Sequence, residues 1–141
     1  MARLWAKTVT FESVRVDDQL PVVVKWETSE SMKMLNARVS PDDDEGGQEI
    51  GQRELSLHSD ALVGYVTEML EKAFPISSIT SQGSSIQVEP SAPIRPEDII
   101  SLSGKVIAKR EEDGCRLVEC EIIVEGEDAT IIARGVAVVS L

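Results

Sequence analysis

One stretch of apolar residues at helical spacing, between residues 57 and 75, constrains the fold of this chain more than any other feature. Ser59 or Asp60 is suited to cap a helix at its start, where the helix dipole favours a carboxylate. Pro75 ends the helix because it cannot continue the hydrogen-bond pattern. The pattern predicts an amphipathic helix with one apolar stripe, made of Ala61, Leu62, Tyr65, Val66, Met69, Leu70 and Ala73.

Two single residues add to this expectation. Gly64 stands in the middle of the expected helix, where glycine costs roughly 1 kcal/mol against alanine. We therefore expect a neighbouring element, most simply a strand, to pack closely against Gly64. His58, the only histidine of the chain, stands at the expected start of the helix.

The length of 141 residues predicts one domain over residues 1–141, long enough to bury its own hydrophobic core. Hydrophobic residues make up 42% and charged residues 28%, which is typical of globular proteins. No apolar run approaches membrane-spanning length, and residues 1–7 lack the apolar region of a signal peptide. We therefore expect a cytoplasmic protein with no membrane partner.

The charge balance narrows the range of partners. With 14 basic and 25 acidic residues the net charge is −11, which argues against nucleic acid and anionic membrane surfaces. An anionic small molecule stays open, because a few local basic side chains suffice to hold one. Arg95, Lys105 and Arg134 are candidates for phosphate contacts, and ordinary surface charges otherwise.

Two cysteines, Cys115 and Cys120, fall in one expected strand. Their odd separation places them on opposite faces, about 16 Å apart along the strand. A disulfide needs Cα atoms within about 7 Å, so they cannot pair with each other, in keeping with a reducing compartment. Because no metal-spaced cluster, phosphate-cradling glycine loop or nucleophile elbow is present, we expect no metal and no cofactor.

The segment before the long helix carries weaker signals. Residues 8–16 read as a short edge strand or an extended arm, and residues 20–28 as a strand rich in β-branched residues. A short amphipathic helix is expected from about residue 28 to the residue before Pro41. An acidic, glycine-containing loop follows at residues 40–47.

Beyond the long helix, strands follow without a helix between them, at about 84–94, 99–109, 115–125 and 129–141. Prolines predict that the first of these is at a sheet edge or bulged in its second half, and Asp113-Gly114 predicts a tight hairpin. The last strand is apolar on both faces, as a central strand covered on each side would be. This order predicts an α+β fold in which a curved antiparallel sheet wraps around the long helix.

Four phrases, spread over nearly the whole chain, resemble the MaoC-like branch of the hotdog-fold proteins. In order they are FESVRVDDQLP at 11–21, LHSDALVGY at 57–65, PIRPEDII at 93–100 and RGVAVV at 134–139. The resemblance implies a hotdog fold. It also implies either a homodimer or a heteromer with a second hotdog subunit.

The resemblance further implies binding of an acyl thioester of coenzyme A or acyl carrier protein. Proteins of this branch add water across an enoyl double bond or remove it from a 3-hydroxyacyl group. The chemistry needs a carboxylate and an imidazole that hold the water and move its proton. It also needs N–H groups directed at the thioester oxygen, and the positive end of the central helix is suited to supply one.

The chain departs from the branch at the catalytic pair, which the branch carries in an Asp-x-Asn-Pro-x-His phrase. When Pro41 is matched to that proline, Arg38 falls on the aspartate and Asp43 on the histidine. The usual dyad is therefore absent. Asp43, or another carboxylate of the 42–45 run, and His58 are the catalytic candidates that remain.

Substrate binding falls by resemblance to the start of the helix, at His58, Ser59 and Asp60. Ser59 replaces a glycine of the branch but keeps a backbone N–H for an oxyanion contact. Each candidate also has a plain structural interpretation: a packed histidine, two helix caps and a solvated acidic loop. Glu68, on the helix beside the stripe, is expected on an exposed face.

Three functions stay open at this point. The first is a hydratase or dehydratase with a displaced dyad. The second is a non-catalytic subunit that completes a thioester tunnel in a heteromer whose partner holds an intact dyad. The third is a thioesterase that uses Glu68 or Asp60.

Overall fold

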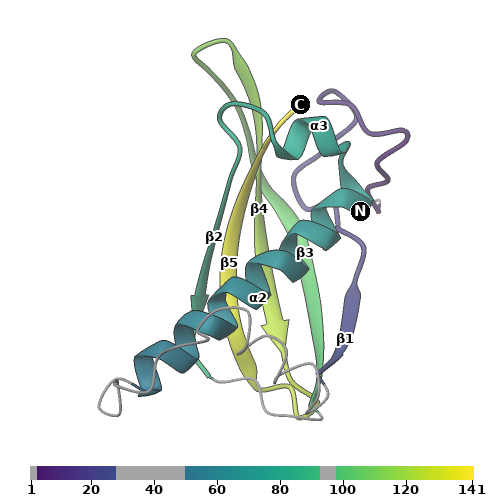
Figure 1. Ribbon diagram of the computed structural model, residues 1–141. Helices are drawn as coiled ribbons and strands as arrows, with labels where there is room; N and C mark the ends of the chain where they lie inside the picture. The colour runs from purple at the N-terminus through teal and green to yellow at the C-terminus, as the bar shows by residue number, and fades with distance from the viewer. Residues whose placement is uncertain (1–2, 28–49, 93–97) are drawn as a thin grey trace.

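A computed structural model describes the backbone of residues 3–27, 50–92 and 98–141, and for residues 50–60, Glu27 and Asp98 the backbone alone. One long helix lies across one face of a five-stranded sheet (Figure 1). Every strand pair is antiparallel, as expected. The expected short helix before Pro41 and the acidic loop lie outside the described residues.

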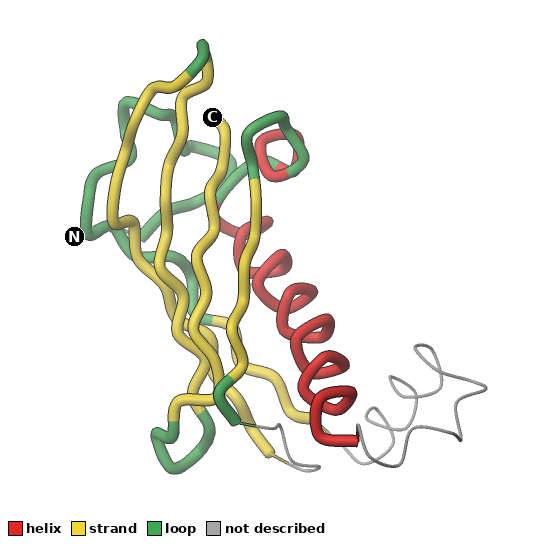
Figure 2. The backbone as a smooth tube through the Cα atoms, turned by 90° about the vertical axis from the view of Figure 1, so that its left-hand side faces the viewer, coloured by secondary structure: helices red, strands yellow, loops and turns green. Residues whose placement is uncertain are grey.

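The elements follow one another as β1 (Val23–Glu27), α2 (Ile50–Ala73), α3 (Ile76–Ile79), β2 (Ser85–Pro90), β3 (Asp98–Glu112), β4 (Cys115–Glu125) and β5 (Ile131–Ser140). In space the strands run in the order β1-β3-β4-β5-β2. β2 is at an edge of the sheet, as its prolines predicted, but it ends at Pro90 and not at residue 94 as expected. Figure 2 shows α2 packed on one side of the sheet.

The core fills the space between α2 and the face of the sheet that α2 covers. Five members of the predicted helical stripe are completely buried: Leu62, Val66, Met69, Leu70 and Ala73. From the sheet, alternate residues of β4 meet them, namely Val118, Cys120, Ile122 and Val124. Both sets were predicted from periodicity, and both are confirmed.

The hairpin between β3 and β4 is also confirmed. Glu112 pairs with Cys115, and the two residues between them have positive φ angles, 50° at Asp113 and 80° at Gly114. Two left-handed residues are what a type I′ turn requires, and its twist matches that of the strands. Cys115 and Cys120 are both free.

Three expectations about the fold are wrong. The helix begins at Ile50 and not near Ser59. Gly64 is exposed, and a Cβ atom added there would have nothing within 4 Å, so no strand packs against it. β5 is an interior strand, but its outer face is open: Val136 is 37% exposed. Within the described ranges, helix covers one face of the sheet only, so these outer residues are not covered as in a parallel sheet.

The N-terminal segment forms turns at residues 8–16, where a short edge strand or an extended arm was expected. It closes one end of the core with Leu4, Val14 and Leu20, all at most 5% exposed. Lys109 connects β3 to this N-terminal segment. The Nζ of Lys109 donates to the Val14 carbonyl at 2.8 Å and lies 4.4 Å from the centre of the Phe11 ring.

Candidate functional site

Four of the residues considered for chemistry belong to α2: His58, Ser59, Asp60 and Glu68. Asp43 lies outside the described residues, as does Arg95. The backbone places His58, Ser59 and Asp60 on α2, and their side chains lie outside the description. The catalytic and binding roles given to these residues stay predictions.

The start of the helix at Ile50 changes the local electrostatics expected for this site. The positive end of the helix dipole is eight residues before His58, about 12 Å along the axis. Ser59 and Asp60 are interior residues, so the expectation that one of them is the N-cap is wrong. The N–H of Ser59 belongs to the helical hydrogen-bond ladder. It is therefore not free to donate to an oxyanion, so the expectation that the Ser59 N–H makes this contact is wrong.

Further along α2 the structure brings three side chains together, and we call them the β1–α2 cluster: Lys25, Tyr65 and Glu68. The Nζ of Lys25 on β1 is 2.5 Å from Oε2 of Glu68 on α2. The same ammonium lies 5.4 Å from the centre of the Tyr65 ring. The side chains of Lys25 and Glu68 are 29% and 39% exposed, so the pair is at the rim of the helix–sheet interface.

Sequence reasoning missed Lys25, although a signal for it exists. In the run Val22-Val23-Val24-Lys25-Trp26, side chains alternate between the two faces of the sheet. Val24 and Trp26 face away from the helix and are more than half exposed, so Lys25 must face the helix. A lone cation on that face needs an acidic partner, and Glu68 on the covering helix provides it.

The ion pair bears on the hydrolytic role considered for Glu68. The contact with Lys25 engages Oε2 of Glu68, and a carboxylate keeps a second oxygen that can accept a proton from water. Exposed or half-exposed pairs of this kind contribute at most about 1 kcal/mol, so the contact can be broken. The pair favours a structural role that ties the edge strand to the helix.

The β1–α2 cluster and position 58 share one side of the helix. Tyr65 follows position 58 by seven residues, which is nearly two full turns and about 10 Å along the axis. Tyr65, with Lys25 beside it, is therefore the described part of the cluster nearest to position 58 on that side of the helix.

Other chemistry receives no support from the described ranges. Within them, no group of three or more His, Cys, Asp and Glu side chains is placed to hold a metal ion. Lys105 and Arg134, considered as phosphate contacts, are exposed on the face of the sheet opposite α2. Burial, with a contribution from Glu119, raises the pKa of the Cys120 thiol to about 12, so this thiol is not a nucleophile at neutral pH. No described helix is long and apolar enough to cross a membrane.

No protein-family model matches the chain, and no curated protein matches its sequence. Solved structures do match its fold. A MaoC-like dehydratase from Rhodospirillum rubrum superimposes with a TM-score of 0.68 and 15% identity, over 94% of this chain and 96% of that one. The (R)-hydratase from A. caviae, described as involved in PHA biosynthesis, gives 0.60 and 17%, over 92% and 98%. The ChsH1-ChsH2 complex from Mycobacterium tuberculosis gives 0.58 and 14%, over 90% and 98%.

These likenesses extend over nine tenths of the chain, and they rest on the shape of the backbone because the sequences share so little. They agree with the strand order and with the single long helix described above. The chain therefore has the hotdog fold that MaoC-like dehydratases and (R)-hydratases share.

Proposed function

We propose that this protein binds an acyl thioester of coenzyme A or acyl carrier protein. We propose further that it hydrates enoyl groups or dehydrates 3-hydroxyacyl groups. The observation that supports this most is the fold likeness to a MaoC-like dehydratase and an (R)-hydratase over almost the entire chain. The four sequence phrases that resemble the MaoC-like branch occur in the same order along it.

In the proposed hydration, a base takes a proton from water while the water oxygen attacks C3 of the enoyl group. The electron pair of the double bond moves toward the thioester carbonyl, and the resulting enolate is then protonated at C2. Asp43 and His58 are the side chains proposed to exchange these protons.

We expect the purified protein to hydrate crotonyl-CoA, and each of the variants Asp43→Ala and His58→Ala to lower kcat/KM by about 10²- to 10⁴-fold, because a positioned acid or base contributes that much. Loss of absorbance of the conjugated thioester measures the rate. Glu71→Ala is the matched control, since Glu71 is an exposed carboxylate on the same helix. Its rate should equal that of the wild type.

Two outcomes count against the proposal in different ways. Turnover that survives in both Asp43→Ala and His58→Ala would mean that other residues carry the chemistry. No turnover above the uncatalysed rate would exclude an enzyme that acts alone. Circular dichroism of each variant separates loss of activity from loss of folding.

A second candidate function is a non-catalytic subunit of a heteromeric hydratase. One observation favours it: Arg38 and Asp43 stand where the MaoC-like branch has its Asp/His pair. A chain with the same fold occurs in the ChsH1-ChsH2 complex. This candidate predicts thioester binding without turnover, and turnover once a partner hotdog chain with an intact dyad is added. A second MaoC-like reading frame beside the gene is where to look for that partner.

The hydrolytic alternative has a sharper test now that Glu68 is placed. A thioesterase that depends on Glu68 should lose hydrolysis of acyl-CoA in Glu68→Gln, with release of free thiol as the measurement. Lys25→Met removes the ion-pair partner and leaves the carboxylate. A thioesterase of this kind should stay active in Lys25→Met, and full activity of Glu68→Gln would exclude it.

A further inference from the structure

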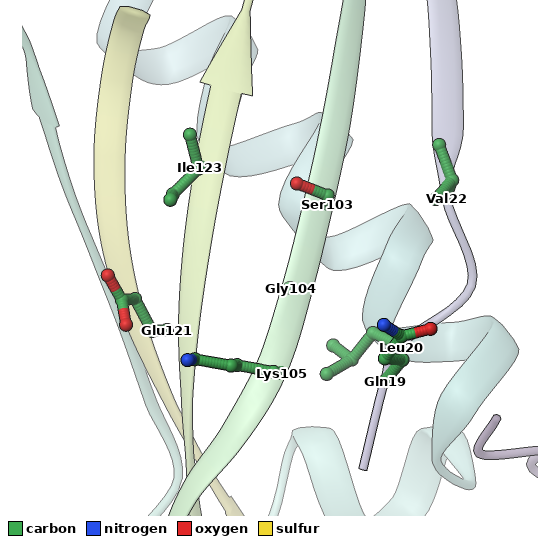
Figure 3. A pocket seen from close by; sticks show the side chains of 8 residues that line it. All are labelled: Gln19, Leu20, Val22, Ser103, Gly104, Lys105, Glu121 and Ile123. Carbon is green, nitrogen blue, oxygen red and sulfur yellow. The ribbon is translucent and has the colours of Figure 1, made fainter. Parts of the chain in front are cut away.

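A pocket of about 350 Å³ lies on the face of the sheet opposite α2, so it is separate from the proposed thioester site (Figure 3). Three neighbouring stretches of chain line it: the segment that leads into β1, then β3, then β4. Their outward side chains form two rows across the strands. The first row is Gln19, Lys105 and Glu121, and the second row is Val22, Ser103 and Ile123.

The first row is polar. Lys105 is the cross-strand partner of Glu121, and Gln19 forms a β-bridge with Lys105 on its other side. Figure 3 shows the Lys105 side chain extending from β3 toward β4. Opposite charges at directly paired positions usually interact. Among the residues that the structure describes, however, neither the Lys105 ammonium nor the Glu121 carboxylate has a hydrogen-bond or ion-pair partner. Glu119, the preceding outward carboxylate of β4, is held by Arg110 at 3.2 Å.

The second row forms the hollow. Ser103 on β3 is the cross-strand partner of Ile123. Val22 stands on the other side of Ser103, because Val22 precedes Val23, and Val23 pairs with Leu102. A short hydroxyl side chain is thus flanked by two larger apolar ones. Between the two rows the segment before β1 takes three residue steps where β3 takes two, so this segment bulges beside the hollow.

We propose that the pocket binds a small zwitterion with an apolar side chain, namely an α-amino acid of about the size of leucine. Such a molecule carries its ammonium and its carboxylate on one carbon atom, so it can meet two adjacent side chains of opposite charge. Its carboxylate accepts from the Lys105 ammonium, and its ammonium donates to the Glu121 carboxylate. Its side chain enters the hollow above Ser103. An apolar cavity of about 150 Å³ already accepts benzene, so the pocket has the necessary room.

A zwitterion suits this pocket better than a ligand with a single charge. An anion beside Lys105 also stands beside the Glu121 carboxylate, and a cation beside Glu121 also stands beside the Lys105 ammonium. The net charge of −11 adds a general repulsion for anions, which a molecule without net charge does not feel. Glu121 is half-buried, so a ligand that covers its carboxylate must supply a paired charge to offset the lost hydration.

Isothermal calorimetry with L-leucine tests the site, because each charge of this probe can be removed separately. We expect saturable binding of leucine. 4-Methylpentanoate lacks the ammonium and 3-methylbutylamine lacks the carboxylate. Each should bind at least about 10-fold more weakly than leucine, since a hydrogen bond between charged groups contributes about that factor. No saturable heat from leucine, or equal affinity for leucine and either analogue, would overturn the proposal.

Substitutions in the two rows locate the binding. Lys105→Met and Glu121→Gln should each weaken leucine binding by about 10-fold, and Ser103→Leu, which fills the hollow, should abolish it. The matched controls are Arg134→Met and Glu125→Gln, which remove an outward cation of β5 and an outward carboxylate of β4 that do not line the pocket. Both controls should bind leucine as the wild type does. Unchanged affinity in Lys105→Met and in Glu121→Gln would show that leucine binds elsewhere, and would overturn the site.

Discussion

Replacing Phe74 with alanine lowers the free energy of unfolding by about 3–5 kcal/mol. Phe74 follows the last residue of α2 and is completely buried, among the largest such side chains in the described chain. Its N–H donates to the Leu70 carbonyl at 2.7 Å, which holds the ring at the end of the apolar stripe. A domain of this size is stable by about 5–15 kcal/mol, so the variant loses a large share of its stability.

Ile76→Ala is the control for Phe74→Ala, since Ile76 is two residues further along and 63% exposed. Its effect should stay within about 0.5 kcal/mol. Urea unfolding followed by circular dichroism measures both variants. Equal effects of the two substitutions would mean that the end of α2 is not packed into the core as described.

Raising the pH from about 9 to 12 destabilises the wild type more than a variant that lacks Cys120. Burial, with Glu119 as the second cause, raises the pKa of this thiol from its ordinary value of 9.0 to about 12 in the folded protein. In this pH range the unfolded chain loses the thiol proton and the folded chain keeps it. The folded state binds more protons, so stability falls as pH rises, by roughly 1.4 kcal/mol per pH unit from this group.

The comparison uses the difference between wild type and Cys120→Ala, because lysine and tyrosine side chains also titrate in alkaline solution. Urea unfolding at several pH values gives a slope for each protein. The wild-type slope should be steeper above pH 9, and the two slopes should agree below pH 8. Cys115→Ser, which removes the other free thiol, is the control for the substitution of a cysteine as such. Parallel slopes throughout would show that Cys120 ionises freely in the folded protein.

The bounds of a strand, and the face that it turns toward the core, were predictable where alternation of apolar residues within the strand itself shows them. β4 runs from Cys115 to Glu125, the bounds expected from alternation between turns. The Asp113-Gly114 hairpin follows from the need for positive φ at both residues. Alternation also identified the buried residues of β4, because the two faces of this strand meet different environments.

The start of α2 could not be read from local signals. Ser59 and Asp60 favour a helix cap, but the same residues are tolerated inside a helix at a modest cost. The structure continues the helix back to Ile50. The prediction that a strand packs against Gly64 was wrong for a related reason. A glycine on an exposed face needs no packing partner, and the sequence alone does not show which face of the helix Gly64 occupies.

The β1–α2 cluster depends on contacts between distant parts of the chain. Lys25 and Glu68 meet because α2 crosses the sheet beside the edge strand. Periodicity assigns each residue to a face of its own element. It does not fix how two elements lie against each other, and this relation decides which side chains form a site.

The central claim is that this fold holds an acyl thioester along α2. Isothermal calorimetry with crotonyl-CoA and octanoyl-CoA tests it most directly, with free coenzyme A as the reference ligand. We predict saturable binding of at least one thioester, tighter than that of coenzyme A. No heat from either thioester at high concentration, with the protein folded, would contradict the claim.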